Sequence, residues 1–219
     1  MQTVLNFLSD LQGHNNREWF EANRQRYVAS LDRMLLFTGM LVQEIRRFDP
    51  EFPLVEPRDC MFRIYRDVRF SPDKRPYKDY FGSYMAAGGR KSIRAGYYLH
   101  LQPGSSLIAG GLWCPSPDVL QACRRDLADN GDEFADIIEK PTFRKYFPEI
   151  EGEQLKTAPK GFDRDAPYIH LLRYKSYSFS YPLTDRQIAS PTLFCDIVAA
   201  FKALYPANRF LNEAIDKWL

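Results

Sequence analysis

The sequence predicts an α+β fold in which helices from both ends of the chain pack on an antiparallel meander sheet. Two observations predict this class. Apolar residues recur at helical spacing near both termini, whereas the middle of the chain alternates with the period of β-strands. At 219 residues the chain is long enough for a sizeable core, and we expect a single domain. It comprises a helical segment at 1–49, a sheet core at about 58–183 and C-terminal helices at about 185–219.

The N-terminal segment predicts a short helix at 4–11 and then a long helical pattern that ends near residue 48. Gly13 ends the first helix, and Glu18 lies three positions after Asn15, the spacing of a capping box. An apolar stripe runs along the long helix, which we expect to serve the core and to break near Ser30.

The middle of the chain contains four segments with strand alternation. They lie at 62–70, 77–84, 96–102 and 107–113. A proline-containing turn at 71–74 joins the first two into a predicted hairpin, and all four make a four-stranded antiparallel meander. Gly110 and Gly111 in the last segment predict a close approach by another backbone, a bulge or a ligand.

The C-terminal half predicts several helices and one more strand. A serine cap followed by proline opens a helix at residue 116, which should stop at Asn130-Gly131. Shorter helices follow from Asp132 and at 141–147, and 168–181 is rich in strand formers. The same serine–proline signature opens a helix at residue 190, which we expect Pro206 to break before a last helix at 209–219.

Charge and cysteine content limit the class of protein. A net charge of +2 is not the global basic footprint of a dedicated nucleic-acid binder. The N-terminus lacks a signal-peptide pattern and no apolar run approaches the length of a membrane span, so we expect a soluble, cytoplasmic protein without a membrane partner. The four cysteines form no CxxC pair, which favours buried free thiols. The sequence leaves the oligomeric state open.

The three histidines, His14, His100 and His170, lack the spacing of a metal site. His100 and His170 are each alone on a predicted strand, where a structural hydrogen bond is the commoner role. Facing each other across a sheet, they would still be a weak metal or acid/base candidate. Walker, GxGxxG and GxSxG motifs are absent, and we expect no metal and no cofactor.

The hairpin at 61–82 holds the densest run of charge and aromatic rings. From residue 58 to residue 78 seven cations face three anions, a local charge of +4. Arg66 lies on the apolar face of the first strand, where a guanidinium needs a carboxylate or a bound anion. Arginine and lysine recognise phosphate and carboxylate groups, so the hairpin predicts a site for a small anionic ligand. The candidate residues are Arg63, Arg66, Asp67, Arg69, Lys74, Tyr77 and Lys78, with Lys160 as a secondary one.

Three interpretations of this site stay open, and none decides whether the protein is an enzyme. In the first, Asp67 aligns Arg63 and Arg69 and leaves donors free for a ligand, which suits binding better than proton transfer. In the second, cations interleaved with aromatic rings bind nucleic acid, and the near-neutral net charge counts against it. In the third, every arginine is paired internally and the hairpin has a structural or protein-interaction role.

Four motifs are spread along nearly the whole chain. They are Asn15–Phe20 with Asn23 and Tyr27, Phe62–Ser71 with Asp73–Lys74 and Pro76–Lys78, Gly110–Trp113 before Pro115, and Pro159–Phe162. Together they resemble the motifs of the domain of unknown function 2461 family, a group of conserved hypothetical proteins, and the second is the most specific. The resemblance implies an α+β fold with a meandering sheet and implies no activity. The family often carries a histidine before the proline that matches Pro167, and this chain has Ala166 there, so a mechanism needing that histidine does not carry over.

Overall fold

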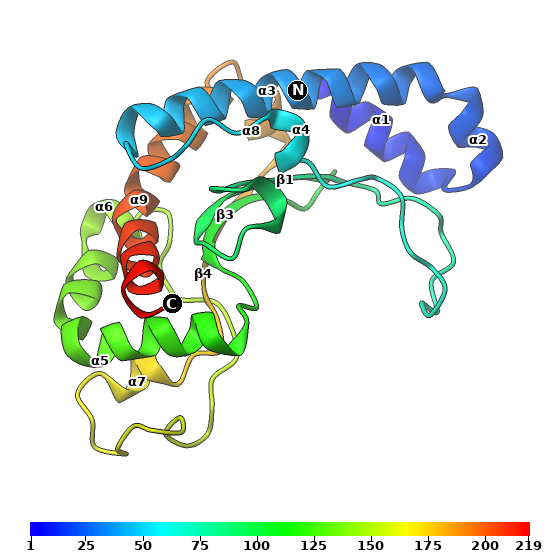
Figure 1. Cartoon of the computed structure of the whole chain (residues 1–219). Coiled ribbons are helices and arrows are strands. Elements are labelled where there is room, and N and C mark those ends of the chain that lie inside the picture. Colours follow the sequence, from blue (N-terminus) through cyan, green and yellow to red (C-terminus); the bar gives the residue numbers. More distant parts are fainter. The chain divides into compact units, whose positions relative to one another are not determined.

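The computed structural model describes all 219 residues and confirms the predicted α+β class (Figure 1). Nine α-helices accompany one four-stranded antiparallel sheet. Its strands are β1 (Phe81–Met85), β2 (Gly96–Leu101), β3 (Ser106–Leu112) and β4 (Tyr177–Leu183). Strands that follow one another along the chain are neighbours in the sheet, so the order is the expected meander.

The helices occupy both ends of the chain and the connection between β3 and β4. They are α1 (Gln2–Gly13), α2 (Arg17–Ala22), α3 (Arg24–Phe48), α4 (Pro57–Cys60), α5 (Pro117–Glu139), α6 (Pro141–Arg144), α7 (Ile169–Leu172), α8 (Asp185–Ala189) and α9 (Leu193–Trp218). One 3-10 turn, η1, lies at Gly89–Lys91. None of these helices combines the length and hydropathy that crossing a membrane requires.

The chain divides into two compact units. The first comprises residues 1–90, 98–108 and 182–198, and the second comprises 91–97, 109–181 and 199–219. Strands β2, β3 and β4 and helix α9 each have residues in both units. The single-domain organisation expected from the sequence stays a prediction.

The core of the first unit forms where α1 and α3 meet β1. Phe7 of α1 and Tyr27 of α3 both contact Phe81 of β1, with ring centroids 6.5 and 6.2 Å apart. Beside them, the Thr38 hydroxyl in α3 donates to the Ser83 hydroxyl in β1 at 3.2 Å, so these buried polar groups are hydrogen-bonded. These contacts fix β1, and with it the hairpin that precedes β1, against the N-terminal helices.

The core of the second unit is built around α5 and the C-terminal part of α9. Phe134 of α5 packs on Phe210 of α9 with ring centroids 5.0 Å apart. The buried guanidinium of Arg124 donates to two backbone carbonyls, Leu172 O at 2.8 Å and Tyr174 O at 3.0 Å. This arginine therefore has a structural role, in which α5 supports the segment that follows α7.

The two glycines of β3 allow neighbouring groups to approach closely. A close approach by another backbone was one of the three predicted alternatives. A Cβ on Gly110 would lie 2.2 Å from Leu204 and 2.5 Å from the Gly96 carbonyl oxygen. Gly111 has a φ of 87°, and a Cβ there would lie 2.0 Å from the Tyr177 carbonyl oxygen. Both glycines are explained by backbone and side-chain packing, without a ligand.

The N-terminal helices differ from the prediction in where they break. The interruption lies at Asn23, between α2 and α3, whereas Ser30 is buried inside α3. The N-cap of α2 is Asn16, whose side chain accepts from the Trp19 backbone N–H at 2.9 Å. Of the two asparagines that the sequence offers as caps, Asn15 bonds to the hairpin instead, so tertiary contacts decide between them.

The helix break predicted at Asn130-Gly131 is present as a kink inside α5, where Asn130 has a non-helical backbone and Gly131 leaves room for the Tyr168 ring. Two other C-terminal predictions are wrong in their boundaries. Helix α9 continues through Pro206, because buried apolar residues on both sides of the proline outweigh the lost backbone hydrogen bond. The predicted strand at 168–181 starts only at Tyr177, because residues 169–172 form α7.

All four cysteines are free, as expected, but only half are buried. Cys60 and Cys123 are buried, and burial raises the pKa of their thiols to about 11 and about 12. Cys114 and Cys195 are exposed, which corrects the expectation of buried thiols at those two positions. Only the exposed pair is therefore accessible to a thiol reagent.

Candidate functional site

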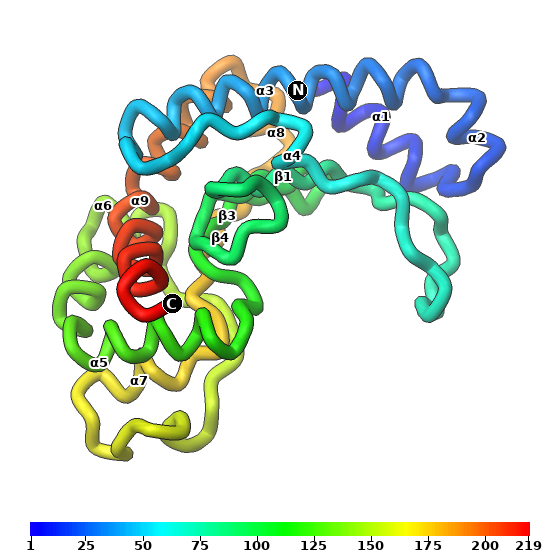
Figure 2. The backbone as a smooth tube through the Cα atoms, in the orientation of Figure 1, coloured from blue at the N-terminus to red at the C-terminus, as the bar shows by residue number.

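The predicted hairpin exists as an irregular arm rather than as two regular strands. Residues 61–83, the hairpin arm, form the loop that leaves α4 and returns into β1 (Figure 2). Antiparallel bridges join Met61 to Ser83 and Tyr65 to Tyr77. The expected strand at 62–70 is absent, because the first half of the arm pairs only with the second half and has no other strand beside it.

A bulge lies at the root of the arm. Between the two bridges the first half of the arm advances by four residues and the second half by six, so the second half carries two extra residues. The Lys78 N–H donates to Ile64 O at 2.7 Å and the Phe62 N–H donates to Gly82 O at 3.0 Å, which places the extra residues between Lys78 and Gly82. Bulges of this kind turn side chains away from the regular alternation and are common beside functional sites.

Asn15 and Phe20, from the N-terminal segment, hold the arm at Tyr77. The Asn15 side chain donates to Tyr77 O at 3.0 Å and accepts from the Tyr77 N–H at 3.1 Å. The Tyr77 ring stacks on Phe20 of α2 at a centroid distance of 3.9 Å and is only 4% exposed. Tyr77 was a candidate ligand-binding residue, and the structure places its ring in the core. The two Asn15 hydrogen bonds and the stacking on Phe20 also fix the position of the Tyr77 backbone.

The tip of the arm, residues 66–75, is a network of internal ion pairs. Arg66 donates to Asp73 at 2.6 Å, and Arg75 donates to the same carboxylate at 2.8 Å. Arg69 binds Asp67 through two hydrogen bonds of 2.7 and 3.0 Å. The arginine partners hold the pKa of both aspartates below the usual range. The sequence predicts either a carboxylate or a bound anion as the partner of Arg66. The structure shows a carboxylate, which Asp73 supplies.

Lys74 is also satisfied within the tip, since its ammonium donates to the Val68 carbonyl oxygen at 3.1 Å. The tip also carries an aromatic ring that is exposed to solvent. Phe70, next to Arg69, is 95% exposed, and the Arg69 guanidinium lies 5.9 Å from the centre of its ring. The tip therefore presents to solvent an aromatic ring and the guanidinium of Arg69, which binds Asp67, while Arg66 and Arg75 bind Asp73.

Two cations at the base of the arm lack such partners. Neither Arg63 nor Lys78 has a carboxylate within ion-pair distance. Arg63 is exposed, and Lys78 is partly buried with its ammonium 5.6 Å from the ring centres of both Phe62 and Tyr80. Burial, and then the positive charge of Arg63, lower the pKa of Lys78. We call Arg63 and Lys78 the base cations.

A hydrogen-bonded chain on β2 borders the base cations. The Tyr98 hydroxyl bonds to His100 Nδ1 at 3.0 Å, and His100 Nε2 bonds to Gln102 Oε1 at 2.9 Å. The Gln102 amide in turn donates to Asp79 at 3.2 Å. Because an amide oxygen only accepts, Nε2 carries the proton and Tyr98 donates to Nδ1. Burial lowers the pKa of His100, which keeps the imidazole neutral near neutral pH.

The ring of Tyr80 connects this β2 network to Lys78. Tyr80 lies under the Lys78 ammonium and against His100, with ring centroids 4.3 Å apart. Gly82 leaves the space that the Tyr98 hydroxyl occupies, because a Cβ on Gly82 would lie 2.7 Å from it. Burial raises the pKa of Tyr98, so its hydroxyl stays protonated. The sequence singled out His100 but not Tyr98. The signal was the alternation of Tyr98, His100 and Gln102 along one strand.

Two other candidate positions, Lys160 and His170, belong to the second unit. Lys160 belongs to the second unit, where it is exposed in the turn after Pro159. His170 lies on α7 and not on a strand, so the cross-sheet pairing with His100 is wrong. The glycine-rich loop after residue 86 packs Gly89 against the Asp59 carbonyl, a structural contact. The structure contains no group of three or more His, Cys, Asp or Glu side chains that could hold a metal ion.

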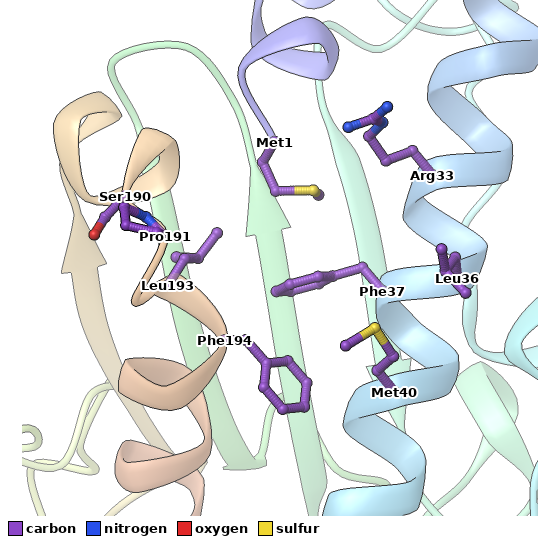
Figure 3. A pocket seen from close by; sticks show the side chains of 9 residues that line it. All are labelled: Met1, Arg33, Leu36, Phe37, Met40, Ser190, Pro191, Leu193 and Phe194. Atoms are coloured by element: carbon purple, nitrogen blue, oxygen red, sulfur yellow. The ribbon is translucent and has the colours of Figure 1, made fainter.

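A small pocket in the first unit has a different character. It encloses about 210 Å³ between α3 and the residues that open α9 (Figure 3). Phe37 and Phe194 meet edge to face across it, with centroids 5.8 Å apart, and Leu36 and Met40 extend the apolar wall. Arg33 is its one charged side chain. Its other charged group is the N-terminal amino group of Met1, whose pKa is lowered by burial and by Arg33, and the arm does not line the pocket.

Comparison with known proteins finds one family. The model of the family described as "Conserved hypothetical protein (DUF2461)" matches residues 3–210, which confirms the resemblance seen in the sequence. Searches of curated proteins and of solved structures gave no significant match. The match places the chain among conserved hypothetical proteins and indicates no activity.

Proposed function

We propose that this chain, which belongs to the DUF2461 family, binds a small oxyanion, either a phosphate or a carboxylate, between the base cations Arg63 and Lys78. The observation that carries the proposal is a partly buried lysine that has an arginine nearby and no carboxylate partner. Arg66, Arg69 and Arg75, by contrast, form ion pairs inside the protein, and Lys74 donates to a backbone carbonyl.

The electrostatics of the base favour an anion. Two like charges raise each other's free energy, and burial adds a desolvation cost to the Lys78 ammonium. A bound oxyanion removes both penalties, since it attracts each cation and accepts their N–H bonds. Charge-assisted hydrogen bonds of this kind are worth about 1.5–3 kcal/mol each. The rings of Phe62 and Tyr80 keep water from one side of the ammonium and strengthen the attraction.

Titration calorimetry with inorganic phosphate at low ionic strength tests this proposal. Arg63→Met and Lys78→Met should each weaken binding by about 10- to 100-fold, which corresponds to one lost charge-assisted hydrogen bond. The matched controls are Arg69→Met and Lys74→Met at the tip, which remove the same charge and should change the affinity by less than about threefold, because neither side chain contacts the proposed anion and both are exposed to water. Equal weakening by all four substitutions, or no binding by the wild type, would contradict the proposal.

A second candidate function rests on Phe70. A fully exposed phenylalanine beside an arginine, at the end of a two-stranded arm, suits stacking on a base or insertion between base pairs. Of the other rings that the sequence offers for stacking, Tyr65, Tyr77 and Tyr80, Tyr77 is buried, whereas Tyr65 is exposed and Tyr80 is partly exposed. Fluorescence anisotropy with a labelled oligonucleotide tests it. Binding should weaken steeply with salt and fall on Phe70→Ala, and affinity that ignores both would exclude it.

We also propose a cytoplasmic location. The free thiols Cys114 and Cys195 are exposed, and exposed thiols persist in a reducing compartment. Cell fractionation with a thiol-trapping reagent tests this: all four cysteines should be recovered reduced from the cytoplasmic fraction. Recovery of a disulfide at either exposed position would contradict the proposal.

A further inference from the structure

We infer that the pocket between α3 and the start of α9 binds a medium-chain fatty acid in its carboxylate form, with the alkyl chain on the apolar wall and the carboxylate on Arg33. No residue of the hairpin arm lines this pocket, so the inference does not rest on the proposed oxyanion site. It assigns a second ligand site to the first unit, for a ligand that is apolar along its length and negatively charged at one end.

The wall of the pocket is apolar, and part of it is exposed to water. Phe37 and Phe194 meet edge to face there, and Leu193 beside them is buried. Two further lining residues are unusually exposed for their type, Leu36 at 68% and Met40 at 44%. An alkyl chain that covers such a group of side chains removes apolar surface from water on both partners, which is favourable.

The charged groups of the pocket lie at one end of it. Figure 3 shows Arg33 and Met1 on one side of the Phe37 ring, and Met40 and Phe194 on the other. Arg33 forms no ion pair, and no acidic side chain lines the pocket. The charged end therefore has two cationic groups, the Arg33 guanidinium and the Met1 amino group, and no anion.

A carboxylate suits this end of the pocket in charge and in shape. The planar fork of N–H donors of an arginine matches the two oxygens of a carboxylate. Burial, and then the charge of Arg33, lower the pKa of the Met1 amino group, so an anion bound here would also relieve the repulsion between the two cations. The apolar wall next to the charged end distinguishes a fatty acid from an inorganic anion, which has nothing to place there.

The dimensions of the pocket limit the length of the chain. Its volume is about 210 Å³, and an apolar cavity of about 150 Å³ is large enough to hold benzene. Arg33 and Met40 are seven residues apart on α3, which corresponds to about 10 Å along the helix axis. A carboxylate on Arg33 thus leaves room along the wall for an extended chain of about eight carbons.

NMR of protein labelled with ¹³C at the methionine methyl groups tests the inference. The chain has five methionines. Met1 and Met40 line the pocket, whereas the others are buried elsewhere, namely Met34, Met61 and Met85. Titration with sodium octanoate should shift the signals of Met1 and Met40 and leave those of the three buried methionines in place. An unchanged spectrum, or equal shifts of all five signals, would overturn the inference.

A series of chain lengths in the same experiment tests the alkyl part. From butanoate to octanoate, each added CH₂ group should tighten binding about two- to fourfold, because it is buried against the apolar wall. Beyond about ten carbons the gain should end, because the chain then extends past the pocket. Affinity that does not depend on chain length, or that keeps rising without a limit, would contradict binding in the pocket.

Substitution of Arg33 tests the charged part. Arg33→Met should weaken octanoate binding by about tenfold, the effect of one charge-assisted hydrogen bond, and should change the binding of uncharged 1-octanol by less than about twofold. Arg46→Met is the matched control, because Arg46 is exposed on the same helix and does not line the pocket. Equal weakening by both substitutions would contradict a role for Arg33.

Two further outcomes would overturn the inference in favour of another site or another occupant. Displacement of octanoate by inorganic phosphate at constant ionic strength would place octanoate at the base of the arm instead. Signals of Met1 and Met40 that change with protein concentration, without octanoate, would show that a second copy of the chain covers the pocket. Octanoate binding that persists in phosphate and needs Arg33 supports the inference, whether or not the oxyanion site exists.

Discussion

The tip and the base of one hairpin arm use the same residue types for different purposes. At the tip, Arg66 and Arg75 share Asp73, and Arg69 binds Asp67. At the base, neither Arg63 nor Lys78 forms an ion pair, although the charge of Arg63 helps to lower the pKa of Asp67. The tip is exposed and bonds mainly to itself, whereas the base is held by α2, β1 and β2. A cation in a rigid site with no partner is therefore a stronger indication of a ligand than a higher density of cations.

The largest expected difference between the two ends is in stability. Phe20→Ala should lower the free energy of unfolding by about 3–5 kcal/mol, because it leaves a cavity under Tyr77 at the base. Phe70→Ala at the tip should change it by less than about 0.5 kcal/mol, because that ring is already in water. Urea unfolding of both variants measures the difference, and similar losses would show that the tip packs on the body in solution.

A smaller effect is expected at Gly82. Gly82→Ala should destabilise the protein by about 1–3 kcal/mol, since the new methyl group meets the Tyr98 hydroxyl and overpacks the base. The same change should break the bond from Tyr98 to His100 Nδ1. NMR of the His100 ring nitrogens checks this second consequence, and an unchanged nitrogen spectrum would contradict the account of the β2 network.

A substitution at Lys78 should stabilise the protein. Folding lowers the pKa of Lys78, so the protonated form is disfavoured by folding, and stability rises as the pH increases from the folded-state pKa towards the ordinary value of about 10.4. Lys78→Met should add about 0.5–1 kcal/mol near neutral pH, and its advantage over the wild type should shrink with rising pH. Unfolding curves at several pH values measure this, and an advantage independent of pH would contradict it.

The smallest effect on global stability is expected at Asp73. Asp73→Asn removes the shared partner of Arg66 and Arg75 and should leave the melting temperature unchanged while amide exchange in residues 66–75 becomes faster. Because the folded-state pKa of Asp73 is depressed, the wild-type tip should stay ordered at all pH values above about 4 and lose order only as the pH falls through that lower pKa. Exchange that is equally fast in wild type and variant would show that the ion pairs do not order the tip.

The fold was predictable where local pattern and tertiary packing agree. The alternation at 96–102 and 107–113 marked β2 and β3, and the N-terminal apolar stripes marked α1 and α3. Local sequence patterns gave wrong predictions where contacts between residues far apart in the sequence determine the secondary structure. Pro206 stays inside α9 because the residues around it are buried, and residues 62–70 alternate like a strand but lack a sheet to join.

The candidate site was predictable as a region but not in its parts. The cations of the arm were identified from local charge, yet the sequence does not show which aspartate binds which arginine. That pairing depends on the turn that brings Asp73 back to Arg66. Alternation along the strand puts Tyr98 on the same face as His100, but only the fold shows that its hydroxyl bonds to His100 and fills the space beside Gly82.

The most direct test of the central claim is a crystal structure of the protein soaked in tungstate, an oxyanion that mimics phosphate and scatters anomalously. We predict an anomalous peak between Arg63 and Lys78, in contact with both side chains, and none at the tip. A peak that lies only at the tip, among Arg66, Arg69 and Lys74, would contradict the account. A crystal without any bound tungstate at the base would contradict it as well.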